Sequence, residues 1–142
     1  MSTQVIVYVL TALAALVVVL TRLRLGREVA GAGRVHVGRT LVRLHTAAGV
    51  LALLTWLVFL LRGDRLSDNT AGIIGIVALA LWWVVVVAGL LILVRWLPSR
   101  GRHAAAGNED TWSEGPGLSV LGHVGMLVGV MIFTYAYLIA AV

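Results

Sequence analysis

The sequence predicts an all-α integral membrane protein whose four helices form an up-down bundle. Of the 142 residues, 61% are hydrophobic and only 12% are charged, whereas a soluble domain usually carries about 25% charged residues. The apolar residues also gather in four runs, each near the ~20 residues that a helix needs to cross a bilayer. Little of the chain remains outside these runs, so we expect a single membrane domain over residues 1–142.

The first apolar run is expected to stay in the membrane as an uncleaved helix. It is followed directly by Arg22, Arg24 and Arg27, whereas a cleavable signal peptide carries its positive charge before the apolar region. The N-terminus is therefore predicted to lie outside. The four predicted spans cover about residues 5–21, 41–61, 71–97 and 117–140.

Arginine positions predict which loops face the cytoplasm. The segment 22–43 holds six arginines against one acidic residue, Glu28, and arginine-rich loops stay on the cytoplasmic side. The turn at 62–70 has only two arginines and fits the exterior, and the loop at 98–116 returns to the cytoplasm. Both the N-terminus and the C-terminus then lie outside. Antiparallel neighbours joined by short loops favour an up-down bundle.

The charged residues indicate a membrane surface as partner. The basic residues are 11 arginines and no lysine, and with 6 acidic residues they give a net charge of +5. Because they flank apolar spans, they indicate contact with lipid headgroups rather than nucleic acid. A chain without lysine is also typical of GC-rich bacterial genomes, so we expect the bacterial inner (plasma) membrane. The chain has no cysteine, which excludes disulfides, iron–sulfur ligation and covalent c-type haem attachment.

Two histidines lie at similar depths in spans that run in the same direction. His45 falls about four residues into the second span and His123 about six residues into the fourth. The difference corresponds to roughly 3 Å along a helix. In an up-down bundle these two spans are diagonal neighbours across the core. We therefore expect both rings to face one another near the cytoplasmic side.

A facing pair of imidazoles predicts a b-type haem, because neutral imidazoles bind iron well and bundle cores commonly build cofactor sites. His45 and His123 would be the ligands of the haem iron. Gly49 would leave room for the macrocycle, and Trp56, on the same helical stripe, would pack on it. Arg39 and Arg43 lie at a level where they would pair with the propionates.

This layout over the second to fourth spans resembles that of small bis-histidine b-type membrane cytochromes. It is also similar to the cytochrome b-like anchor subunits of respiratory enzymes. The resemblance implies an electron-transfer subunit with no catalytic activity of its own. Such a subunit would exchange electrons with a redox partner or a membrane quinone, alongside other membrane subunits.

Other interpretations stay open at this point. Both histidines could be interfacial residues that bond to water or headgroups, or they could serve quinone binding or a proton relay without haem. The protein could also be a cofactor-free accessory subunit of a larger membrane complex, with the GxxxG pair Gly125 and Gly129 as a contact surface. A transporter is disfavoured, because no carboxylate lies within a span. His36 and His103 fall in loops, where we expect solvated side chains.

Overall fold

The computed structural model describes residues 1–28, 39–101 and 116–142, with side chains for 1–20, 43–94 and 120–142. These residues contain four long helices and one short 3-10 helix, and no strand occurs in this part of the chain. The prediction of an all-α chain is confirmed. The elements are α1 (Thr3–Glu28), α2 (Arg39–Arg62), η1 (Gly63–Arg65), α3 (Asp68–Gly101) and α4 (Pro116–Leu138).

Each long helix contains a segment that is long and apolar enough to cross a membrane. By the length and composition of these segments, the chain is a multi-pass membrane protein, and the predicted spans agree with them to within a few residues. The segments are Thr3–Leu20, Arg43–Arg65, Asp68–Val94 and Val120–Leu138.

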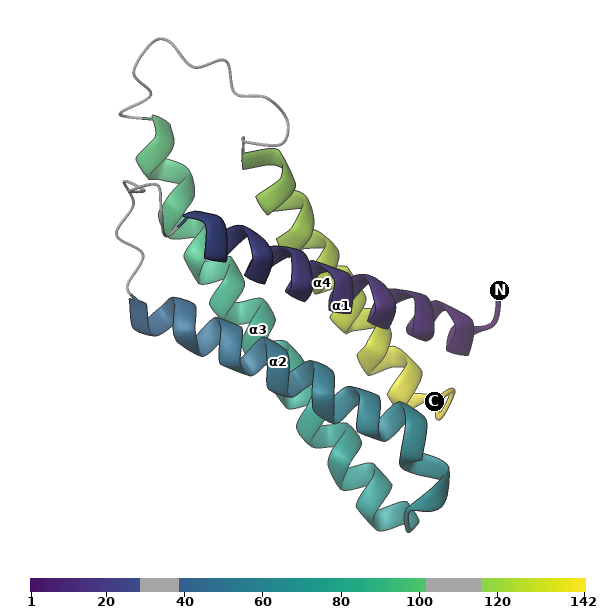
Figure 1. Cartoon of the computed structure of the whole chain (residues 1–142). Coiled ribbons are helices and arrows are strands. Elements are labelled where there is room, and N and C mark those ends of the chain that lie inside the picture. Colours follow the sequence, from purple (N-terminus) through teal and green to yellow (C-terminus); the bar gives the residue numbers. More distant parts are fainter. Residues whose placement is uncertain (29–38, 102–115) are drawn as a thin grey trace.

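Consecutive helices run in opposite directions (Figure 1). The closest packing is between α2 and α3, followed by α3 against α4, while α1 contacts α4 and α2 more sparsely. The backbones of α2 and α4 are not in direct contact among the described residues. Any group that joins α2 to α4 must therefore be a side chain that reaches across the core.

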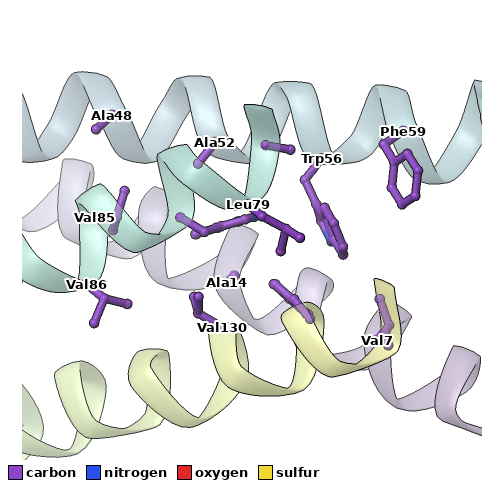
Figure 2. Packing of buried hydrophobic residues seen from close by; sticks show 14 residues of the cluster. Val7, Ala14, Ala48, Ala52, Trp56, Phe59, Leu79, Val85, Val86 and Val130 are labelled. Atoms are coloured by element: carbon purple, nitrogen blue, oxygen red, sulfur yellow. The ribbon is translucent and has the colours of Figure 1, made fainter. Parts of the chain in front are cut away.

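Small residues on α2 allow the close approach of α3. Ala48 and Ala52 are buried, and Figure 2 shows both on the side of α2 that faces α3, with Ala48 opposite Val85. In lipid, helix association depends on such close van der Waals packing because the bilayer is as apolar as the helix surface. The α2–α3 pair therefore forms the most closely packed part of the molecule.

Aromatic rings fill the core toward the other end of the helices. Trp56 of α2 and Trp82 of α3 have no exposed surface, and both pack on Phe133 of α4, with ring centroids 4.9 and 5.8 Å away. Trp56 Nε1 also donates a hydrogen bond of 3.1 Å to Thr11 Oγ1. This bond connects α1 to the core of the other three helices.

The adjacent tryptophan, Trp83, has a different environment. Its side chain is exposed at a depth where lipid is expected, and its indole N–H donates to Thr134 Oγ1 of α4 at 3.2 Å. An indole N–H in hydrocarbon needs an acceptor within the protein. The two adjacent tryptophans thus differ: Trp82 is a buried core ring, and Trp83 links α3 to α4 by a hydrogen bond.

Replacing Gly75 with alanine is expected to destabilise the helix bundle. A Cβ at this position would lie 2.5 Å from Tyr137 Cε2 and 3.1 Å from Phe59 Cε2. Over-packing of this kind costs about 1–3 kcal/mol, more than the ~1 kcal/mol that alanine gains over glycine in a helix. Unfolding of the purified protein in detergent measures the effect.

The matched control for this variant is Gly72→Ala, one turn earlier on α3. A Cβ there would contact only the Tyr137 hydroxyl oxygen, at 3.7 Å, which is an ordinary van der Waals distance. This variant should be as stable as the wild type or more so. Equal stability of the two variants would contradict the packing described at Gly75.

Candidate functional site

The structure brings His45 and His123 together across the core. His45 lies six residues after the start of α2 at Arg39, and His123 lies seven residues after the start of α4 at Pro116. Both are therefore in the second turn of helices that run in the same direction. Their ring centroids are 6.2 Å apart and the ring planes differ by 20°. Since the α2 and α4 backbones are not in contact, these two rings connect the two helices across the core.

Gly89 of α3 forms the wall of the gap between the rings. A Cβ built on this glycine would lie 3.0 Å from His45 Cε1, 3.1 Å from His123 Nε2 and 2.7 Å from His123 Cδ2. These distances are shorter than ordinary carbon contacts of about 3.5–4.0 Å. The two rings therefore approach the α3 backbone only because residue 89 has no side chain.

One nitrogen of His45 is buried without a hydrogen-bond partner. Its Nδ1 atom makes no hydrogen bond among the described residues. In a histidine ligand, the nitrogen that binds the metal is the one that makes no hydrogen bond. Nδ1 is thus the candidate ligand atom of His45.

The ring spacing matches that of two imidazoles bound to one metal ion. Metal–imidazole bonds are about 2 Å long and each nitrogen lies roughly 1 Å from its ring centre, so coaxial ligands have centroids roughly 6 Å apart. The observed centroid distance is 6.2 Å. Two imidazoles fill two positions of a six-coordinate iron, and the porphyrin nitrogens fill the other four. The centroid distance therefore matches that of two ligands of one iron, but coordination also needs a nitrogen of each ring to point at the same ion, and the two rings are stacked here.

A haem also needs free space beside α3, and this condition is harder to meet than the spacing of the two rings. A flat macrocycle centred between the rings extends several ångströms to every side, and the Gly89 backbone lies on one of these sides. Admitting the macrocycle requires α3 to lie farther from the ring pair at this point than it does here. Gly89, which has no side chain, lies at the position where this free space is needed.

The remaining predicted site residues lie at varying distances from the pair. Gly49 is buried one turn after His45, and a Cβ added to it would contact only Val85 Cγ2, at 3.9 Å. Arg43 is exposed, and its offset of two residues from His45 turns the side chain about 200° around the helix. The Arg39 side chain lies outside the described residues. The propionate role of both arginines stays a prediction.

Trp56 lies on the same helix as His45 but at a different depth. Eleven residues separate them, which corresponds to about 16 Å along the axis. Its ring packs against Phe59 and Phe133, with centroids 5.3 and 4.9 Å away. The structure therefore places Trp56 in the aromatic core, and its packing on a macrocycle stays a prediction.

The sequence analysis did not identify Gly89. A signal was present, because Ala88 and Gly89 are the only small residues in the bulky apolar run 81–94. Among the described residues, no cluster of three or more histidine, cysteine, aspartate or glutamate side chains could hold a metal ion. His36 and His103 lie outside the described residues, so their predicted solvation stays a prediction.

No protein-family model matches the chain, and neither the curated proteins nor the solved structures contain a significant match.

Proposed function

We propose that this protein is a membrane electron-transfer subunit that binds one haem b between α2 and α4. The observation that carries the proposal is the spacing of His45 and His123, whose ring centroids are 6.2 Å apart. The second support is the buried His45 Nδ1, which has no partner among the described residues. An unsatisfied polar atom within an apolar core is costly, and a bond to iron would remove that cost.

The chain contributes binding, orientation and burial. The apolar side chains around the pair would limit the access of water, which is one of the factors that set a haem potential. When bound, haem supplies one-electron redox chemistry. The protein would accept single electrons from a redox partner or a membrane quinol and pass them on, without converting a substrate of its own.

The proposal includes an orientation in the membrane. The ends of α1 and α3 and the starts of α2 and α4 lie at the end of the molecule that carries the histidine pair. Segments 22–43 and 95–102, which adjoin or include these helix ends in the sequence, hold nine of the 11 arginines, which favours a cytoplasmic location. We infer an up-down bundle in a bacterial plasma membrane, with both termini outside, the haem near the cytoplasmic face, and Arg39 and Arg43 as propionate partners.

An optical spectrum of the purified protein tests the proposal. We expect a Soret band that sharpens and shifts on reduction with dithionite, together with distinct α and β bands. The pyridine haemochrome should identify haem b at one equivalent per chain. A protein that remains colourless after expression with added haem precursor and after titration with hemin would reject haem binding.

A second function, as a cofactor-free accessory subunit, is favoured by one feature of α4. Gly125 is exposed and Gly129 is buried, and a Cβ added to Gly122, Gly125 or Gly129 would meet no described atom within 4 Å apart from the backbone of its own helix. This face leaves room for the close approach of another helix, as in small-residue helix contacts. A colourless protein that copurifies at fixed stoichiometry with other membrane subunits would support this function instead.

A further inference from the structure

We propose that the lipid-facing side of α2 binds an anionic phospholipid, whose phosphate contacts Arg43 and whose acyl chain lies along the helix as far as Leu54. The lipid belongs to the leaflet at the end of the molecule that carries the histidine pair, here called the histidine end. Three observations support this site: an exposed apolar stripe on α2, the position of Arg43 at the head of the stripe, and the distribution of charge between the two ends of the molecule.

The α2 stripe is a row of exposed residues on one side of the helix. They are spaced three or four residues apart, which keeps side chains on one face of a helix. All of them lie within about 100° around the helix axis, on the side turned away from the buried residues Ala52 and Trp56. The members of the stripe are Arg43, Leu44, Ala47, Leu51, Leu54 and Val58. Apart from Arg43 the stripe is apolar, so it offers a surface for hydrocarbon chains.

The apolar part of the stripe has the length of one leaflet. Ten residues separate Leu44 from Leu54, which corresponds to about 15 Å along the helix axis. The hydrocarbon core of a bilayer is about 30 Å thick, and one leaflet contributes roughly half of it. Leu44, Leu51 and Leu54 are 54%, 51% and 54% exposed. An acyl chain that begins at the depth of Leu44 therefore contacts apolar side chains along its full length.

Arg43 lies at the headgroup end of the stripe. It is exposed, and it is the first residue of the α2 segment that is apolar enough to cross the membrane. Its offset of two residues from His45 turns its side chain about 200° around the helix, away from the histidine pair. A guanidinium binds phosphate through two parallel N–H donors. Arg43 is thus the phosphate-binding residue of the site.

The distribution of charge favours an anionic lipid over a zwitterionic one. At the opposite end of the molecule, segment 62–68 holds two arginines and two aspartates, so its net charge is zero. The other nine arginines and four acidic residues lie in segments 22–43 and 95–114, which adjoin or include the helix ends at the histidine end. The whole net charge of +5 therefore belongs to the histidine end. An anionic headgroup is attracted by this charge, whereas phosphatidylcholine has no net charge.

Native mass spectrometry of the protein in detergent, with equal amounts of phosphatidylglycerol and phosphatidylcholine, tests the proposal. The wild type should retain phosphatidylglycerol about fivefold more than phosphatidylcholine, the order expected for one arginine at an anionic surface. Arg43→Gln should lose most of this preference. The matched control Arg62→Gln removes an exposed arginine at the other end of α2 and should keep it. Equal retention of both lipids by the wild type would refute the proposal, as would an unchanged preference in Arg43→Gln.

Two further measurements identify what the site binds. Glycerol phosphate carries a phosphate group without acyl chains, so at millimolar concentration it should leave the retained phospholipid in place. Displacement of the lipid by glycerol phosphate would show that the surface binds phosphate alone and would overturn the role of the α2 stripe. Arg43→Lys should keep only part of the lipid preference, because lysine retains the charge but lacks the paired donors of arginine.

The Arg43→Gln variant also separates lipid binding from the propionate contact proposed for Arg43. Because the side chain is exposed, the variant should fold as the wild type does, and a hemin titration should give the wild-type affinity. Lowered hemin affinity with an unchanged lipid preference would assign Arg43 to the propionates and overturn the inference. If the wild type takes up no hemin, the proposed function fails, while the lipid measurements still decide the role of Arg43.

Discussion

Alanine at either His45 or His123 is expected to abolish the low-spin spectrum of the haem protein. The two rings are the only donors proposed for the axial positions, so either substitution leaves iron with one protein ligand. The product should be five-coordinate and high-spin, with hemin affinity lowered roughly 100-fold or more, since even groups that only support a metal ligand cost 10–100-fold when removed. The double variant should take up no stoichiometric haem.

Two matched histidine variants control for this result. His36→Ala and His103→Ala change the other two histidines of the chain, which the sequence places in loops. They should retain the low-spin spectrum and the hemin affinity of the wild type. Added imidazole should restore low-spin iron in His123→Gly, because the truncated side chain leaves room for a free ligand. A low-spin spectrum that survives in both His45→Ala and His123→Ala would contradict the assignment of ligands.

The position of the histidine pair could be predicted because depth in a membrane is read by counting residues. His45 and His123 stand close to the starts of two spans that run in the same direction, and helical rise converts these offsets into similar heights. The four spans themselves followed from uninterrupted apolar runs. The hydropathy of the sequence indicates both the four spans and the depth of the two histidines, without any information on how the helices pack.

Residues whose role depends on rotation about a helix axis were harder to predict. Trp56 shares the helical stripe of His45, and this was correct as a statement about the face of α2. A shared stripe does not imply a shared height, and eleven residues carry Trp56 about 16 Å away. Gly89 presents the opposite case. Its depth along α3 could be counted from the sequence. Because α3 is apolar on every face, however, no pattern indicated which of its residues face the two histidine rings.

The largest expected effect on stability is that of Trp56→Ala. This side chain has no exposed surface, it packs between Phe59 and Phe133, and its indole N–H bonds to Thr11. Truncation of a buried aromatic side chain typically costs about 3–5 kcal/mol because a cavity remains. The contact that joins α1 to the core would be lost at the same time. Unfolding of the purified protein in mixed detergent micelles should show the loss.

Trp56→Phe separates the packing of the ring from its hydrogen bond. The smaller aromatic ring retains most of the contacts and leaves only a small cavity, while the donor to Thr11 Oγ1 disappears. Side-chain hydrogen bonds between membrane helices contribute about 0.6 kcal/mol on average, so the variant should be only slightly less stable than wild type. Thr11→Val should produce a similar change, and the two substitutions together should cost less than their sum.

The same variant separates the aromatic core from the histidine site. Because Trp56 lies three turns from His45, Trp56→Phe should leave the Soret band and the hemin affinity unchanged while stability falls. His45→Ala should do the reverse, since its ring contributes to ligand binding at the other end of the core. A shifted spectrum in Trp56→Phe would place the macrocycle against Trp56, as the sequence first suggested. The site would then have to extend along α2 toward the middle of the membrane.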